Sequence, residues 1–201
     1  MYIKICGLQT EETVAAAVDA GANAVGFVFA PGSPRIISAE LAATLGRRVP
    51  STVETVGVFR NQPIDTVIET ARRAALTTVQ LHGDEPLADM SRLRDEGFRT
   101  LRAFSASAYT ALAPAEKLAW ESERILLDAV EPGAGVAFDA ALLEGAIPPV
   151  YWLLAGGLNP GNVAQLIAAL NPSGVDVSSG VESSRGVKDS GLIRDFIRAA
   201  S

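Results

Sequence analysis

The sequence predicts an α/β protein, a compact single-domain (β/α)8 barrel of the TIM type, and three observations support this. Eight short runs rich in Val, Ile and Leu recur along the chain, and each is followed by a polar turn and an Ala/Leu/Glu-rich stretch with helical spacing. Several runs are almost continuously apolar, which is typical of parallel strands buried on both faces. The 201 residues leave about 25 for each of eight units, which is short for a barrel but sufficient.

The first units carry the clearest local signals. Strands are expected, in chain order, at 2–6, 23–29, 53–59, 78–82, 99–104, 124–128, 151–156 and 174–180. After the first strand, Thr10 is a candidate N-cap for a helix that Gly21 ends, and Pro63 marks the start of another helix. We expect the fifth and sixth helices to be short or irregular, because 105–120 contains Pro114 and the stretch FDAALLEG allows barely two turns.

An open, doubly wound sheet would also alternate strands and helices. Such a sheet with a dinucleotide site would carry G-x-G-x-x-G after its first strand, and CGLQTEE does not supply it. The barrel is therefore favoured, with one domain over residues 1–201.

Composition excludes several classes of function. The net charge of −6 and the pI near 4.9 argue against a nucleic-acid-binding surface. No apolar run approaches the roughly 20 residues that cross a bilayer, so no membrane association is expected. A single cysteine and the absence of a leader-like start favour the cytoplasm. One histidine and one cysteine give no zinc-type spacing, so no metal is expected.

In a (β/α)8 barrel the reactive groups gather at the carboxyl ends of the strands, where the βα loops meet at one mouth. The side chains there are a thiol, two carboxylates, a histidine, arginines and small residues: Cys6, Arg35, His82, Arg102, Asp128, Gly156, Gly157, Asp176, Ser178, Ser179 and Gly180.

The loops after the seventh and eighth strands, AGGLNP and VSSGVE, predict a phosphate site. Glycine lets the backbone N–H groups approach an anion closely, and a helix N-terminus beyond the loop adds a favourable dipole. Such a site needs no lysine, which agrees with an acidic protein. The alternative is that the glycines only make tight turns.

Cys6 and Asp128 are candidates for proton transfer from opposite sides of the mouth. A thiol near a cation can ionise and act as a base or nucleophile, although a lone cysteine is more often a small buried apolar residue. Asp128 can stay protonated in an apolar mouth and donate a proton to a leaving oxygen, or it can simply cap the next turn.

Two further side chains are candidates for binding. Arg35 follows APGSPR, a loop whose prolines and glycine restrict the backbone, and its guanidinium can pair with a carboxylate at two points. Its alternative is a solvated surface arginine. His82 can polarise a substrate or hydrogen-bond within the rim, and a structural or binding role is favoured over proton transfer.

Taken together and in order, these motifs closely resemble phosphoribosylanthranilate isomerases of tryptophan biosynthesis. The segments that carry the resemblance span nearly the whole chain: KICG at 4–7, AVGFVFAPGSPR at 24–35, VGVFRN at 56–61, VQLHGDE at 79–85, LLD at 126–128, LAGGLNP at 154–160 and GVDVSSGVESSRGVKD at 174–189.

The resemblance implies an Amadori rearrangement of N-(5-phosphoribosyl)anthranilate to 1-(2-carboxyphenylamino)-1-deoxyribulose 5-phosphate, without a cofactor. It also implies that Cys6 is the general base, that Asp128 is the general acid and that Arg35 binds the anthranilate carboxylate. The remaining substrate-binding residues are then expected to be His82, Gly156, Gly157, Asp176, Ser179 and Gly180. The chain departs from the family after Asp128, where Pro132, Ala134 and Ala140 replace a glycine, a threonine and a tryptophan.

Two other functions stay open at this point. An isomerase of another aminoaldose phosphate would use the same chemistry, but such enzymes resemble barrels with two aspartates as acid and base. A catalytically silent barrel that senses a phosphorylated metabolite would not need Cys6 for anything measurable. The sequence allows either a monomer or a homodimer.

Overall fold

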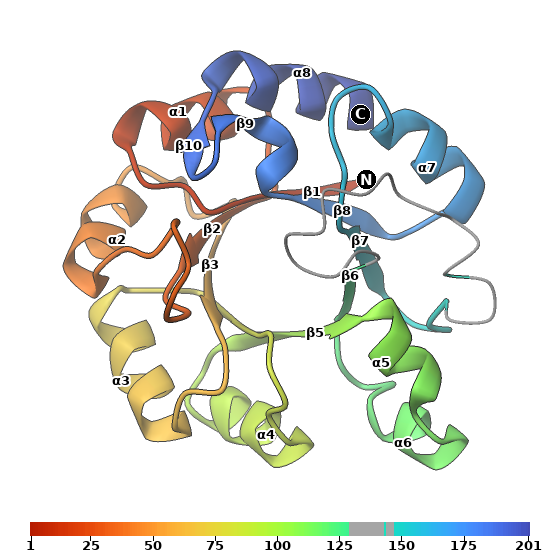
Figure 1. Ribbon diagram of the computed structural model, residues 1–201. Helices are drawn as coiled ribbons and strands as arrows, with labels where there is room; N and C mark the ends of the chain where they lie inside the picture. Colours follow the sequence, from red (N-terminus) through yellow and green to blue (C-terminus); the bar gives the residue numbers. More distant parts are fainter. Residues whose placement is uncertain (129–142, 144–146) are drawn as a thin grey trace.

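The computed structural model describes residues 1–128, 143 and 147–201, and these form a closed barrel of eight parallel strands, which confirms the predicted fold. Figure 1 shows the helices as an outer ring around the strands. Within these residues no helix has the length and apolarity that a membrane span requires.

The strands follow one another around the barrel in sequence order, and β1 closes the ring by pairing with β8. They agree with the expected runs to within three residues at each end. The strands are β1 Tyr2–Cys6, β2 Ala24–Val28, β3 Glu54–Phe59, β4 Thr78–Leu81, β5 Arg99–Ser105, β6 Ile125–Asp128, β7 Trp152–Ala155 and β8 Gly174–Val177.

The helices are α1 Glu11–Asp19, α2 Ala39–Gly46, α3 Ile64–Arg73, α4 Leu87–Asp95, α5 Ala106–Ala111, α6 Pro114–Ala119, α7 Val163–Leu170 and α8 Ser190–Ala200. The side chain of Thr10 caps α1 by accepting from the backbone of Thr13, as predicted. The fifth unit has two six-residue helices in place of one, because Ser105 caps the first and Pro114 begins the second. The expected sixth helix lies outside the described residues.

Side chains alternate along each strand between two apolar environments. The outward set packs under the helices in one large cluster that includes Ile3 and Ile5 of β1. The inward sets are small and lie inside the barrel: Leu101, Ala103, Leu126, Leu153 and Ala155 form one, and Cys6, Val28 and Val58 form the other. The barrel is thus packed with side chains, and its functional surface lies at an end.

The amino-terminal end of the barrel is filled by an ion-pair network. Arg124 donates from both terminal nitrogens to Glu54, at 3.0 and 3.1 Å, and the hydroxyl of Thr78 donates to the same carboxylate at 2.6 Å. The Tyr2 and Tyr151 rings meet edge to face beside it. The opposite, carboxyl-terminal end carries the thiol, carboxylates and glycine loops that the sequence singled out.

A short hairpin follows β8 at that end. The chain passes from β8 into a single 3₁₀ turn, η2 Ser179–Val181, and then into β9 Glu182–Ser184 and β10 Val187–Lys188 before α8 begins. In the view of Figure 1 the hairpin is drawn beside α1.

Candidate active site

Strand β1 places a lysine and the cysteine on the same inward face. Cys6 ends the strand and is 6% exposed, and Lys4, two residues earlier, is completely buried. The Lys4 ammonium donates to Oδ1 of Asp176 on the neighbouring strand β8 at 2.8 Å. An unpaired ammonium could not be buried there, so this pair allows a cation to lie directly below the thiol.

The surroundings of Cys6 act on its thiol in opposite directions. Burial raises the pKa of Cys6, and the negative charge of Asp176 adds to that. The Lys4 ammonium, by charge and by hydrogen bonding, and the Lys188 ammonium both lower it, but burial prevails. Cys6 is therefore protonated at rest. The two lysines nevertheless favour its thiolate form, which is the form that acts as a base.

The sulfur atom lies against a glycine of the next strand. Gly26 of β2 is the register partner of Cys6, and a Cβ added to Gly26 would lie only 2.9 Å from Sγ. That is closer than a carbon and a sulfur can approach without repulsion. Gly26 thus leaves the space that the Cys6 side chain occupies.

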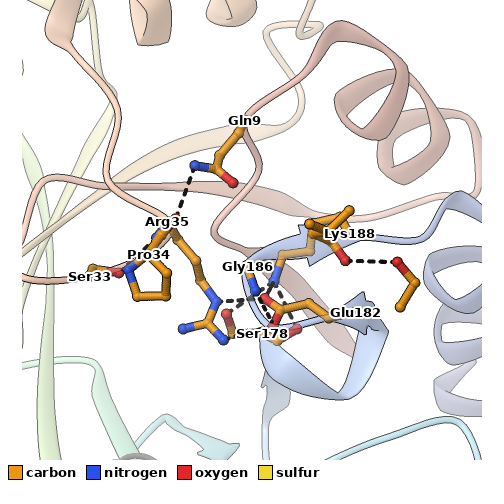
Figure 2. A network of polar contacts seen from close by, with 10 residues as sticks. Gln9, Ser33, Pro34, Arg35, Ser178, Glu182, Gly186 and Lys188 are labelled. Atoms are coloured by element: carbon orange, nitrogen blue, oxygen red, sulfur yellow. Dashed lines mark hydrogen bonds and ion pairs between the residues drawn. The ribbon is translucent and has the colours of Figure 1, made fainter.

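Arg35 is held by an ion-pair network that Figure 2 shows. Its Nε and Nη2 donate to the two carboxylate oxygens of Glu182, at 2.6 and 2.9 Å. Lys188 donates to the same carboxylate at 2.7 Å and to the carbonyl of Ser178 at 2.8 Å. The Nε and Nη2 edge of the Arg35 guanidinium, which the sequence suggested for two-point pairing with a carboxylate, is occupied by Glu182 of the hairpin.

The Glu182 carboxylate is almost completely buried and strongly stabilised as an anion. Burial alone would raise its pKa, but hydrogen bonds from Arg35, from Lys188 and from the Gly186 backbone N–H lower that pKa to about 2. The hairpin after β8 and the loop after β2, whose strands flank β1, are consequently joined by one ionised carboxylate.

His82 and Asp128 come together on the other side of the mouth. His82 follows β4, and its Nε2 lies 3.8 Å from Oδ2 of Asp128 at the end of β6. Burial lowers the pKa of His82 to about 4, so the imidazole is neutral at pH 7 and the contact is not an ion pair. Its other nitrogen, Nδ1, accepts from the side-chain amide of Gln80 at 3.1 Å.

The loop that carries His82 is fixed by a buried arginine on β5. Arg102 donates to Oε2 of Glu85 and to the carbonyl of Gly83, both at 2.7 Å, and its guanidinium lies over the Phe104 ring. Glu85 in turn accepts from the backbone N–H of Gly83 at 2.8 Å. Arg102, singled out at the rim from the sequence, thus supports the loop from the outer face of β5.

The two glycine loops expected to bind phosphate lie against each other. Gly156 and Gly157 follow β7 with left-handed backbones, φ 89° and 64°. Gly180 touches this loop so closely that a Cβ would lie 1.7 Å from the carbonyl oxygen of Leu158. Ser179 begins the 3₁₀ turn beside it. Beyond this loop, η2 and the hairpin come before α8, which begins at Ser190.

The structure therefore places Cys6, Asp176, Arg35, His82, Asp128 and both glycine loops at the carboxyl-terminal end of the barrel, as the sequence predicted. Among the described residues, no group of three His, Cys, Asp or Glu side chains is arranged to hold a metal. The altered positions Pro132, Ala134 and Ala140 lie outside the described residues.

Sequence reasoning missed the groups that act on these residues: Lys4, Gly26, Gln80, Glu182 and Lys188. Two of them left a signal in the strands. Lys4 and Gln80 interrupt apolar runs at positions whose side chains point into the barrel, where an unpaired polar group is costly. Nothing in the local sequence pairs Glu182 with Arg35, 147 residues away.

Comparisons with known proteins identify the family of this chain. The profile of the family described as N-(5'phosphoribosyl)anthranilate (PRA) isomerase matches residues 3–199. The chain is 42% identical over 207 residues to the N-(5'-phosphoribosyl)anthranilate isomerase of Rhodopseudomonas palustris (strain HaA2), a match that covers 99% of this chain and 95% of that relative.

Solved structures give the same result. The phosphoribosyl anthranilate isomerase of Thermotoga maritima superposes with a TM-score of 0.89 at 36% identity, covering 100% of this chain and 98% of the other. A phosphoribosyl anthranilate isomerase in complex with reduced 1-(o-carboxyphenylamino)-1-deoxyribulose 5-phosphate gives a TM-score of 0.85 at 35% identity, with the same coverage. The chain belongs to the N-(5'-phosphoribosyl)anthranilate isomerase family of enzymes.

Proposed function

We propose that this enzyme converts N-(5'-phosphoribosyl)anthranilate to 1-(2-carboxyphenylamino)-1-deoxyribulose 5-phosphate, with Cys6 as general base and Asp128 as general acid. The observation that carries the proposal is the position of a buried thiol with lysines beside it and a carboxyl group at strand ends of the same barrel mouth, in a member of this family. No cofactor takes part.

The reaction needs two proton transfers on one sugar. Asp128 gives its proton to the furanose ring oxygen, the bond from C1′ to that oxygen breaks, and the anilino nitrogen's lone pair forms the C1′=N bond of an iminium ion. Cys6, as the thiolate, takes the proton from C2′, and the electron pair of that C–H bond forms the enolamine. The enolamine then tautomerises to the ketone.

The environment of Cys6 supports its part in this scheme. A base must be ionised when the C2′ proton leaves, and burial disfavours a lone thiolate. Lys4 and Lys188 offset that penalty from two sides, one through β1 and the other through the hairpin. Because the Lys4 ammonium is paired with Asp176, its positive charge stays in place when the Cys6 thiol loses and regains its proton.

Substrate binding is proposed at the two sides of the mouth. The phosphate lies on the backbone of Gly156, Gly157, Ser179 and Gly180, where the adjoining loops present N–H groups. Arg35 binds the anthranilate carboxylate through the part of its guanidinium that Glu182 leaves accessible, because Nε and Nη2 are already engaged. Asp176 and His82 complete the binding set around the sugar.

The direct test is to mix the protein with freshly prepared phosphoribosylanthranilate and follow the loss of its anthranilate fluorescence. Cys6→Ser and Asp128→Asn should each abolish measurable turnover, because each removes the group that moves one proton, while substrate binding is largely kept. Near-normal turnover by Asp128→Asn would overturn the assignment of the acid.

The same assay, together with a binding measurement on Cys6→Ala, separates this enzyme from a silent phosphate-binding barrel. For a silent barrel the wild-type protein leaves the fluorescence unchanged, and Cys6→Ala binds phosphorylated ligands like the wild type. Cytoplasmic location and a monomeric or homodimeric state remain predictions from the sequence.

A further inference from the structure

A row of three polar groups runs from the interior of the barrel to the proposed acid. Gln80 of β4 and His82 directly after it lie two residues apart on the inward face, and Gln80 is only 1% exposed. The Gln80 amide nitrogen is 3.1 Å from Nδ1 of His82, and Nε2 of His82 is 3.8 Å from Oδ2 of Asp128.

Packing alone does not account for a polar side chain at Gln80. Its register partners on β3 and β5 are Val58 and Leu101, and its Oε1 is buried with no hydrogen-bond donor among the described residues. An apolar side chain of similar length would fill the position without an unpaired oxygen. A polar side chain kept here at that cost points to a task for its amide.

The contact between Gln80 and His82 decides the imidazole tautomer. An amide –NH₂ can only donate, so Nδ1 must accept, and a neutral imidazole then carries its single proton on Nε2. The imidazole is neutral at pH 7, because its pKa is about 4. The opposite amide orientation would require Nδ1–H and would turn a lone pair of Nε2 toward Asp128.

We propose that Gln80 is a positioning residue, which holds neutral His82 as the Nε2–H tautomer so that an N–H donor faces the Asp128 carboxylate as it forms. The inference rests on Asp128 being the general acid proposed above. The acid proton moves from Asp128 to the ring oxygen of the substrate, and His82 keeps its own proton throughout. The donor stabilises the negative charge that Asp128 gains in that step.

The distance fits a contact that tightens during the reaction. At 3.8 Å, Nε2 is beyond hydrogen-bond reach of Oδ2, and catalytic hydrogen bonds often shorten only in the substrate complex. The charged groups that act on His82 come from several elements around the mouth: Lys4, Arg60, Arg102 and Asp176. None of them replaces Gln80 as a donor to Nδ1 among the described residues.

The chain has one histidine, so its tautomer can be read without assignment by ¹⁵N NMR of histidine-labelled protein. We expect Nε2 to carry the proton and Nδ1 to show the shift of a bare nitrogen at pH 7. Gln80→Glu keeps the shape but offers an acceptor, so it should invert the tautomer. Gln80→Met keeps the length and offers neither group, so both tautomers should be populated.

The turnover rate should depend on which tautomer His82 adopts. We expect kcat to fall in the order wild type, Gln80→Met, Gln80→Glu, with a loss of about 10- to 100-fold for Glu and little change in KM. The Met variant carries no added charge, so it separates the tautomer from a charge effect. Gln165→Met, on the exposed face of α7, is the matched control and should leave the spectrum and kcat unchanged.

Three results would overturn the proposal: a wild-type spectrum with the proton on Nδ1, a Gln80→Glu protein that keeps Nε2–H, or an inverted tautomer with unchanged kcat. None of these depends on whether Cys6→Ser or Asp128→Asn abolishes turnover. Failure of the acid and base assignment is therefore recognised separately, from those two variants.

Discussion

The replacement of Gly26 by alanine tests whether the position of the Cys6 sulfur controls the reaction. The added Cβ would lie 2.9 Å from Sγ, 3.1 Å from Cα and 3.3 Å from Cβ of Cys6, so all three of its nearest neighbours belong to the proposed base. Contact distances are near 3.5–4.0 Å, so the sulfur must move by about 0.6–1 Å. The atoms nearest to the added methyl group, one of the backbone and two of the side chain, thus all belong to the proposed base.

Two magnitudes follow from that displacement. Inserting a methyl group into a packed interior costs about 1–3 kcal/mol of stability. A misplacement of about 1 Å in a catalytic group costs about 100-fold in rate. We expect Gly26→Ala to fold, to unfold at lower urea concentration, and to lose about 100-fold in kcat/KM in the fluorescence assay.

The matched control is Gly46→Ala at the end of α2. A Cβ at Gly46 meets nothing closer than the Thr55 methyl at 3.8 Å, an ordinary contact, and alanine is the better helix former. This variant should keep full activity and equal or higher stability. If Gly26→Ala retained kcat/KM within about threefold of the wild type, close packing around the sulfur would not be what positions the base.

Two further predictions concern the charges that flank the mouth. Lys4→Met should raise the pKa of Cys6 further, which would appear as an alkaline shift in the pH dependence of its alkylation by iodoacetamide. The same substitution should lower the free energy of unfolding by about 3–5 kcal/mol, because Asp176 is left buried and unpaired. An unchanged pH dependence of alkylation would contradict the role given to Lys4. For Glu182 the fall in pKa from 4.5 to about 2 corresponds to about 3 kcal/mol of stability, which is present above pH 4.5 and is lost as the pH falls toward 2. Glu182→Gln should therefore be about 3 kcal/mol less stable in urea at pH 7 and clearly less affected at pH 3.5, with a raised KM because Arg35 is loosened; an equal deficit at both pH values would refute the ionic explanation.

The order of strands and helices followed from local sequence signals. An apolar run that ends at a turn, a threonine at a helix start and a proline after a strand each act within a few residues, and all three gave the observed elements at 2–6, Thr10 and Pro63. The short, irregular fifth unit was likewise indicated by Pro114, although its division into two helices was not. The sequence did not predict the hairpin after β8, because VESSRGVKD has few strand-forming residues. The two short strands are held instead by ion pairs such as that of Lys188 with Glu182.

The position of the candidate site was also predictable, since a parallel barrel brings all strand ends to one mouth. Cys6, His82, Asp128 and Asp176 were therefore placed together without any knowledge of distances. The protonation states of these side chains were not predictable from the sequence. The neutral His82 depends on its burial, and the resting thiol of Cys6 depends on burial set against two ammonium groups.

The sequence by itself determined the (β/α)8 alternation, the rim at which chemistry can occur and the residue types available there, because these depend on periodicity and on chain order. Only the tertiary structure decided that Glu182 occupies the Arg35 guanidinium, that Asp176 neutralises Lys4 and that Gln80 donates to His82. Apart from the last, these contacts join residues more than 100 positions apart. Their energies come from burial and charge that exist only once the barrel has closed.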